Sequence, residues 1–186
     1  LFAGEARRLV TLSSAAHGNC DVDLDDPNYA DEDSYDPWLS YGRSKSANAL
    51  FAREAANRFG GRGLLSFSVH PGGFMTELGR HLDDELIAQM MDRISERAAA
   101  AGESGESADA DGGFQFKSVE AGAATQVWAA TSDDLAGHNG AYLADCRGGE
   151  LGVNIGAYGS EPWILDDGTA SRLWTLSEQL LDLEFE

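Results

Sequence analysis

The sequence predicts an α/β fold with a parallel sheet, because two strand-like runs flank a helix-like segment. The runs RLVTLSS at residues 8–14 and LLSFSVH at 64–70 are apolar and β-prone, as buried strands of parallel sheets are. Residues 39–59 between them favour a helix. A strand, a helix and a second strand in this order form one βαβ unit, whose two strands are parallel.

The helix over 39–59 is predicted by its apolar face and by signals at both ends. Asp36 is a candidate cap, Pro37 suits the first turn, and Gly60-Gly61 forms a stop. Apolar residues recur on one side of this helix, as the spacing of a helix that packs against a sheet requires: Ala47, Leu50, Phe51, Ala55 and Phe59.

The other elements follow from local pattern and composition. Helices are expected at 84–100, 118–131 and 167–183, and a short strand at 141–143. In the second of these helices Val119, Ala123 and Val127 lie on one side. Residues 15–38 form a long acidic loop, and 102–113 are predicted to be a flexible low-complexity insertion rich in Gly, Ser, Glu and Asp.

The strongly acidic composition limits the classes of partner. The 186 residues contain 13 Lys and Arg against 32 Asp and Glu, a formal net charge of −19. Nucleic acid and anionic membrane surfaces are disfavoured, since both bind basic proteins. Acidic residues concentrate in the segment 21–36, which is interpreted as a solvated surface loop, with adaptation to high salt as the alternative.

The most specific local feature is the run Tyr41-Gly42-Arg43-Ser44-Lys45. On a helix, side chains four residues apart project from the same face. A lysine ammonium beside a phenol favours the phenolate and lowers a phenol pKa that is ordinarily about 10. Such a tyrosine can exchange a proton with a carbonyl or an alcohol. The strand-end residue Ser14 and the pair Pro71-Gly72 map to the same edge of the sheet, where open α/β sheets bind ligands.

Several segments together resemble the short-chain dehydrogenases/reductases, in particular the branch of the retinol dehydrogenases and WW-domain-containing oxidoreductases. They are VTLSSAAH (10–17), YGRSKSAN (41–48), HPG (70–72) leading to TEL (76–78), KSVEAGA (117–123), GAYLADC (140–146) and SRLWTLSE (171–178). The resemblance covers nearly the whole chain. It implies a Rossmann-like, doubly wound parallel sheet in three layers, α/β/α, and the nicotinamide cofactor NADP or NAD.

The resemblance also implies catalytic roles for Ser14, Tyr41 and Lys45. Tyr41 is the general acid in carbonyl reduction, Lys45 lowers its pKa and hydrogen-bonds the nicotinamide ribose, and Ser14 polarises the substrate oxygen. A strand-end hydroxyl that caps a backbone amide is the structural alternative for Ser14. Ser13 is the weaker candidate, since the serine of the family ends the strand motif.

The same resemblance implies a cofactor-binding segment after the second strand. Pro71, Gly72, Phe74 and Thr76 wrap the nicotinamide, with the backbone at Phe74 facing the carboxamide and Thr76 bonding the carboxamide or a phosphate. Tyr41 and Lys45 belong to the cofactor-binding set as well. On sequence alone, Pro71-Gly72 is equally a simple turn.

One departure from the family is large. No G-x-G-x-x-G or G-x-x-x-G-x-G follows a strand, and Gly60-Gly61-Arg62-Gly63 follows a helix. Residues 1–186 are therefore expected to be a single partial Rossmann-like domain, the carboxyl-terminal part of a dehydrogenase whose amino-terminal half is missing. The predicted function is NAD(P)-dependent oxidation or reduction of a lipophilic alcohol or carbonyl compound. The alternative is an inactive fragment that serves as an interaction module or has no function.

Other residues suggest no further chemistry. His17 and His70 lack partners at metal-ligand spacing, so no metal site is predicted and structural roles are expected. Cys20 and Cys146 form no C-x-x-C pair, which fits free thiols in a reducing compartment. No run is long and apolar enough to span a membrane. A cytoplasmic location is expected, with association through a missing amino-terminal anchor and homo-oligomerisation both left open.

Overall fold

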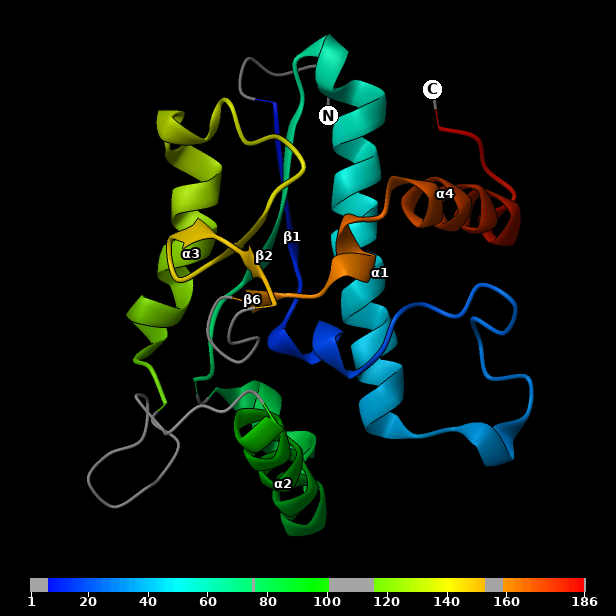
Figure 1. Ribbon diagram of the computed structural model, residues 1–186, viewed down its shortest axis with the longest axis vertical. Coiled ribbons are helices and arrows are strands. Elements are labelled where there is room, and N and C mark those ends of the chain that lie inside the picture. Colours follow the sequence, from blue (N-terminus) through cyan, green and yellow to red (C-terminus); the bar gives the residue numbers. More distant parts are fainter. Residues whose placement is uncertain (1–6, 75, 101–115, 153–158, 186) are drawn as a thin grey trace.

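The computed structural model describes residues 7–74, 76–100, 116–152 and 159–185, and it contains the predicted parallel sheet (Figure 1). Strands β1 (Arg8–Leu12), β2 (Leu65–His70) and β3 (Tyr142–Ala144) are parallel neighbours, in that order. Leu12 is in register with Val69, so β1 and β2 end at the same level. A short β4 (Arg147–Gly148) runs antiparallel to β3, and β5 (Glu150–Leu151) pairs with β6 (Gly159–Ser160).

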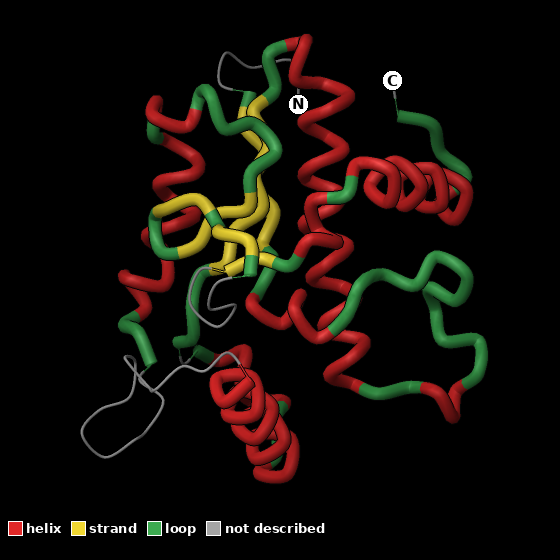
Figure 2. The backbone as a smooth tube through the Cα atoms, viewed as in Figure 1, coloured by secondary structure: helices red, strands yellow, loops and turns green. Residues whose placement is uncertain are grey.

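Helices cover both faces of the sheet, which confirms the predicted three layers (Figure 2). Helix α1 (Pro37–Phe59) packs on one face together with α4 (Asp167–Leu181), and α3 (Val119–Thr131) packs on the other. Helix α2 (Asp84–Ala100) lies beyond the end of the sheet where β1 and β2 terminate (Figure 1). In the described ranges no helix combines the length and hydropathy that a membrane span needs.

Both ends of α1 carry the signals that the sequence predicts. The Asp36 carboxylate accepts a hydrogen bond from the amide of Leu39 at 2.8 Å, and Pro37 occupies the first turn. The predicted stop is confirmed, since α1 ends at Phe59 and Gly60 is its C-cap. The chain continues as a 3₁₀ turn, η3 (Gly60–Arg62), and the left-handed residue that ends it is Gly63, with φ of +87°.

Helix α3 does not bury the apolar face that the sequence predicts; it buries a different one. Val119 and Val127 are 56% and 57% exposed, whereas Gly122, Thr125 and Ala129 are buried. Small residues let a helix backbone approach its neighbour closely, and the ring of Phe74 occupies the space above Gly122. Close packing of small side chains therefore decides the orientation of α3.

The remaining differences concern element boundaries. The last helix ends at Leu181, two residues before the predicted end, because Asp182 adopts a left-handed conformation with φ of 49°. On the apolar side of α1, Leu50, Ala55 and Phe59 are buried and Ala47 is half-buried. Phe51 is 41% exposed and stacks on Trp174 of α4. The predicted insertion at 102–113 lies outside the described residues.

Helix α1 contacts the 3₁₀ turn η1 (Ala15–Asn19), which follows β1, at van der Waals distance. A Cβ atom at Gly42 would lie 2.8 Å from Asn19 Cβ and 2.9 Å from the carbonyl oxygen of Ala16. Only glycine allows this contact, since one of the opposing atoms belongs to the backbone. Gly42 lies between Tyr41 and Lys45 in the sequence. The contact therefore also fixes where these two residues lie relative to the end of β1.

We predict that Gly42→Ala destabilises the chain, although glycine to alanine inside a helix ordinarily stabilises. The added methyl group has to displace η1, which should lower the free energy of unfolding by about 1–3 kcal/mol. Urea unfolding followed by circular dichroism measures the change. Gly61→Ala is the matched control, since a methyl group there would meet no other described part of the chain within 4 Å. Equal stability of the two variants would contradict the close contact.

Candidate functional site

Tyr41 and Lys45 lie one turn apart on the exposed side of the first turns of α1. The Lys45 ammonium is 5.3 Å from the centroid of the Tyr41 ring. Trp38 packs edge-on against the same ring, with centroids 6.5 Å apart. The Tyr41 side chain is 39% exposed and is therefore accessible to a ligand. The spacing predicted from the sequence thus places a cation against an accessible phenol ring.

The end of β1 is joined to this part of α1 by three hydrogen bonds, two of which involve Lys45. The Lys45 Nζ atom donates to the carbonyl oxygen of Leu12 at 3.4 Å, and Asn48 Nδ2 donates to the same oxygen at 2.8 Å. The buried Ser13 hydroxyl donates to the backbone carbonyl of Lys45 at 2.8 Å. Partial burial lowers the pKa of Lys45 below its ordinary value, because a charged ammonium loses hydration there. Loss of the proton is therefore easier at Lys45 than at an exposed lysine.

Ser14 lies at the same end of β1, where it caps a turn. Its hydroxyl oxygen accepts a hydrogen bond from the amide of Ala16 at 3.1 Å, which is the structural role considered above. Among the described residues no acceptor takes the Ser14 hydroxyl proton. The cap therefore fixes the oxygen and leaves its proton available for a bond to another group.

His70 joins the segment after β1 to the segment after β2. Its Nδ1 atom accepts from the amide of Ala15 at 3.3 Å and from the amide of Gly72 at 3.4 Å. Accepting at Nδ1 requires that this nitrogen is unprotonated. Ser14 and Pro71-Gly72 are thereby held at one edge of the sheet. The structural role expected for His70 is confirmed.

Phe74 and Thr76 differ in their surroundings. Phe74 forms a parallel β-bridge with Lys117, and its ring packs on Gly122 of α3. Its backbone is thus fixed against the start of α3. Thr76 lies exposed immediately before the 3₁₀ turn η4 (Glu77–His81). The predicted cofactor contacts of both residues remain predictions.

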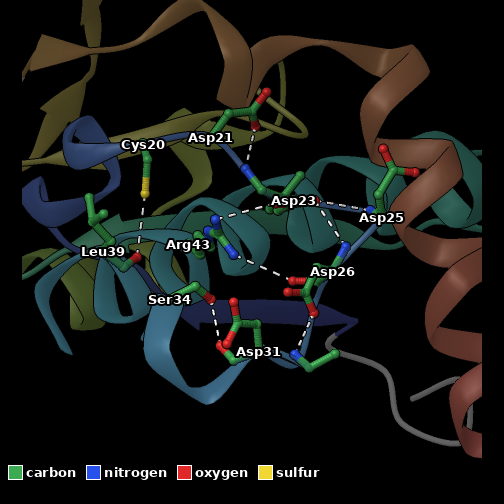
Figure 3. Close-up of polar contacts among 11 residues, drawn as sticks. Cys20, Asp21, Asp23, Asp25, Asp26, Asp31, Ser34, Leu39 and Arg43 are labelled. Atoms are coloured by element: carbon green, nitrogen blue, oxygen red, sulfur yellow. Dashed lines mark hydrogen bonds and ion pairs between the residues drawn. The ribbon is translucent and has the colours of Figure 1, made fainter. Parts of the chain in front are cut away.

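The acidic loop is anchored on α1 by Arg43, the central residue of the tyrosine–lysine run (Figure 3). The Arg43 guanidinium pairs with the Asp23 carboxylate at 3.3 Å, and it lies 4.5 Å from the centroid of the Tyr29 ring. Asp23 also accepts from the amides of Asp25 and Asp26, and these bonds lower the pKa of its carboxyl group. Local turns therefore give this loop a defined path beside the first turns of α1.

His17 is buried behind the candidate site and has a structural role. Its Nδ1 atom lies 2.7 Å from the carbonyl oxygen of Ser14, and its Nε2 atom accepts from the amide of Glu161 at 3.3 Å. The ring packs against Tyr142, with centroids 4.9 Å apart. Burial raises the pKa of the Tyr142 phenol far above its ordinary value, so the phenol keeps its proton. The described ranges contain no group of side chains that could hold a metal ion.

The sequence analysis assigns no structural contact to four residues that bond segments near the candidate site: Ser13, Asn48, Lys117 and Asp145. From the sequence Ser13 is only the weaker candidate for a catalytic hydroxyl, whereas in the structure it is a buried donor to the backbone of α1. Asn48 lies one turn after Lys45 and two turns after Tyr41 on the same helix face, a spacing that could have drawn attention to it. The pairing of Lys117 with Asp145 spans 28 residues and has no local signal.

Comparison with known proteins shows similarity to several oxidoreductases over nearly the whole chain. The sequence is 35% identical over 184 residues to the oxidoreductase calI of Penicillium decumbens and 35% identical over 183 residues to the short-chain dehydrogenase/reductase prx1 of Penicillium rubens. It is 32% identical over 176 residues to human retinol dehydrogenase 14. These alignments cover 96%, 95% and 95% of the chain, but 49%, 47% and 44% of the relatives. No protein-family model matches the sequence.

A solved structure supports the fold. An uncharacterised protein of Mycobacterium paratuberculosis superposes with a TM-score of 0.60 at 29% identity, over 97% of this chain and 52% of its own. Fold and sequence together define a Rossmann-like α/β domain. The chain belongs to the short-chain dehydrogenase/reductase family, as its motifs predicted. It spans about half the length of the curated relatives that it matches.

We predict that Lys45 titrates below 10.5, the ordinary lysine value. The chain has two lysines, Lys45 and Lys117, so ¹³C-dimethylation gives few NMR signals, and a Lys117→Arg variant assigns them. The same chain unfolded in urea is the control. Because the folded state disfavours the charged form, the contribution of Lys45 to stability should increase as the pH rises from the folded to the unfolded pKa. Equal pKa values in the two states would contradict the prediction.

Proposed function

We propose that this chain provides the proton-transfer site of an NAD(P)-dependent oxidoreductase, which moves hydride between the nicotinamide and a lipophilic alcohol or carbonyl compound. One observation carries the proposal. The Lys45 ammonium lies 5.3 Å from the Tyr41 ring and is bonded to the end of β1, at the sheet edge where α/β proteins bind ligands. The family relationship agrees with this chemistry.

The residues at this edge suit the nicotinamide end of the cofactor. Lys45 would bond the ribose hydroxyls, and the segment from Pro71 to Phe74, with Thr76, would line the nicotinamide. The half-buried ammonium and the segment fixed by His70 support this assignment. The sequence has no glycine-rich turn between a strand and a helix for the pyrophosphate. When bound, the cofactor supplies the hydride at nicotinamide C4.

Three side chains would handle the proton and the substrate oxygen. In carbonyl reduction the Tyr41 hydroxyl gives its proton to the substrate oxygen, which becomes the alcohol. The Lys45 ammonium stabilises the phenolate that remains on Tyr41, since the opposite charge lies next to the ring. The Ser14 hydroxyl donates to the same substrate oxygen from its capped position. In alcohol oxidation the same groups act in reverse.

A second candidate function is an interaction module without catalysis. Among the described strands β1 is at the edge of the sheet, and Leu12 at its end is 47% exposed. An edge strand presents unpaired backbone groups that can bind another strand. Measured turnover decides between the two candidates.

We predict that Tyr41→Phe abolishes most turnover in the intact protein that contains this chain. The substitution removes only the proton donor, so kcat should fall by about 10²- to 10⁴-fold while cofactor binding changes by less than about twofold. Steady-state kinetics and cofactor titration measure the two effects. Tyr35→Phe, at a 56% exposed tyrosine of the acidic loop, is the matched control. Near-normal kcat in Tyr41→Phe would overturn the assigned role.

Lys45 should behave differently from Tyr41 in the same assays. We predict that Lys45→Ala lowers kcat and weakens cofactor binding together, because one ammonium serves both the phenol and the ribose. A lower kcat with unchanged cofactor affinity would contradict the proposed contact between Lys45 and the ribose.

We predict that the isolated 186-residue polypeptide does not bind NADH or NADPH with micromolar affinity. Pyrophosphate binding needs the backbone amides of a glycine-rich turn, and a net charge of −19 repels phosphates. Titration followed by nicotinamide fluorescence is the direct measurement, with sedimentation to establish the oligomeric state. Micromolar binding by a folded monomer would show that these residues suffice for the whole cofactor site.

A further inference from the structure

The segment after β2 is fixed from the side of α3 by the backbone of Lys117. The Lys117 amide donates to the carbonyl oxygen of Gly73 at 2.8 Å, and Lys117 forms a parallel β-bridge with Phe74. Lys117 immediately precedes Ser118, whose hydroxyl caps α3 by accepting from the amide of Ala121. The segment 71–74 is therefore attached directly to the first turn of a helix.

The side chain of Lys117 lies over Gly72. A Cβ atom on Gly72 would be 2.8 Å from Lys117 Nζ and 2.9 Å from both Cδ and Cε. Gly72 also has φ of +88°, a conformation that side-chain-bearing residues rarely adopt. The lysine stem thus occupies the space that a side chain at position 72 would need, and it restricts movement of the segment on this side.

Asp145 fixes the charged end of Lys117. The Lys117 ammonium forms a salt bridge with the Asp145 carboxylate, which lies in the turn between β3 and β4. This turn has two left-handed residues, Asp145 with φ of 54° and Cys146 with φ of 53°. The Cys146 amide donates to the buried Thr125 hydroxyl of α3 at 3.2 Å, so the turn itself is held. Lys117 therefore connects the segment after β2 to a fixed turn after β3.

We infer that Lys117, fixed by Asp145, is a positioning residue for the segment Pro71–Phe74. Its relevance to turnover rests on the proposed function, in which this segment lines the nicotinamide. The competing role is direct contact between the Lys117 ammonium and a phosphate of the cofactor. The two roles predict opposite effects of Asp145→Asn. Positioning predicts weaker cofactor binding, because the lysine loses its anchor. Direct contact predicts tighter binding, because a negative charge next to the ammonium disappears.

The first experiment tests positioning without any cofactor. Amide hydrogen exchange of the 186-residue chain, read in a peptide that contains residues 71–74, should become about two- to fivefold faster in Lys117→Met and in Asp145→Asn. A half-exposed ion pair stabilises the closed, exchange-protected state by a free energy that corresponds to this range of rates. Lys117→Arg, which keeps the stem and the charge, should restore slow exchange. Exchange within α1 should stay unchanged, which excludes general unfolding.

Asp167→Asn is the matched control for removal of one carboxylate. It breaks the salt bridge to Arg53 between α1 and α4, where the two atoms are 2.7 Å apart. Exchange at 71–74 should be unaffected by this variant. Unchanged exchange at 71–74 in both Lys117→Met and Asp145→Asn would overturn the inference, whatever the protein catalyses.

The second experiment uses the intact protein and separates binding from chemistry. Lys117→Met and Asp145→Asn should each raise the KM for the cofactor about two- to fivefold while kcat changes by less than about twofold. Tighter cofactor binding in Asp145→Asn would overturn the positioning role and would indicate that the Lys117 ammonium contacts a cofactor phosphate directly. Absence of turnover in the unsubstituted intact protein would overturn the proposed function, and the exchange experiment would still decide the role of Lys117.

Discussion

The direct contact between α1 and the segment that follows β1 is the constraint on which the candidate site depends. Gly42 lets the helix meet η1 without an intervening side chain, and the Ser13 hydroxyl bonds the Lys45 carbonyl. With a bulkier residue at either point the helix would be displaced from the sheet edge. The positions of Tyr41 and Lys45 relative to the end of β1 follow from this contact, since both residues lie within one turn of Gly42.

The same contact extends into the core through a buried polar network. The Ser46 hydroxyl lies 3.1 Å from the carbonyl oxygen of His17 and 2.7 Å from that of Cys20. Trp163 Nε1 donates to the His17 carbonyl at 3.2 Å, which adds the segment before α4. Buried polar groups are costly unless they are paired, so this network favours one arrangement of α1, η1 and the carboxyl-terminal segments. The face of α1 that carries Tyr41 and Lys45 is thereby supported from behind.

The two lysines of this acidic chain lie on either side of the carboxyl edge of the sheet, in different electrostatic settings. The Lys45 ammonium has the Tyr41 ring and the Leu12 carbonyl as neighbours, and no salt bridge links it to a described carboxylate, whereas Lys117 forms a salt bridge with Asp145. An ammonium without a carboxylate partner can act on a phenolate or on a ribose hydroxyl. One that is paired with a carboxylate serves mainly to hold chain segments together. The placement of Asp145 therefore separates a candidate catalytic lysine from a positioning lysine.

The sequence by itself determined the βαβ order, the Asp36 cap of α1 and the spacing of Tyr41 and Lys45, because these depend on neighbours within a few residues. Only the tertiary structure decided which face α3 buries, since the contact of Phe74 with Gly122 outweighs the exposure of Val119 and Val127. It also decided the partners of Ser13 and Lys117, which lie 32 and 28 residues away along the chain. Contacts of this range depend on how helices pack on the sheet, which local propensity does not encode.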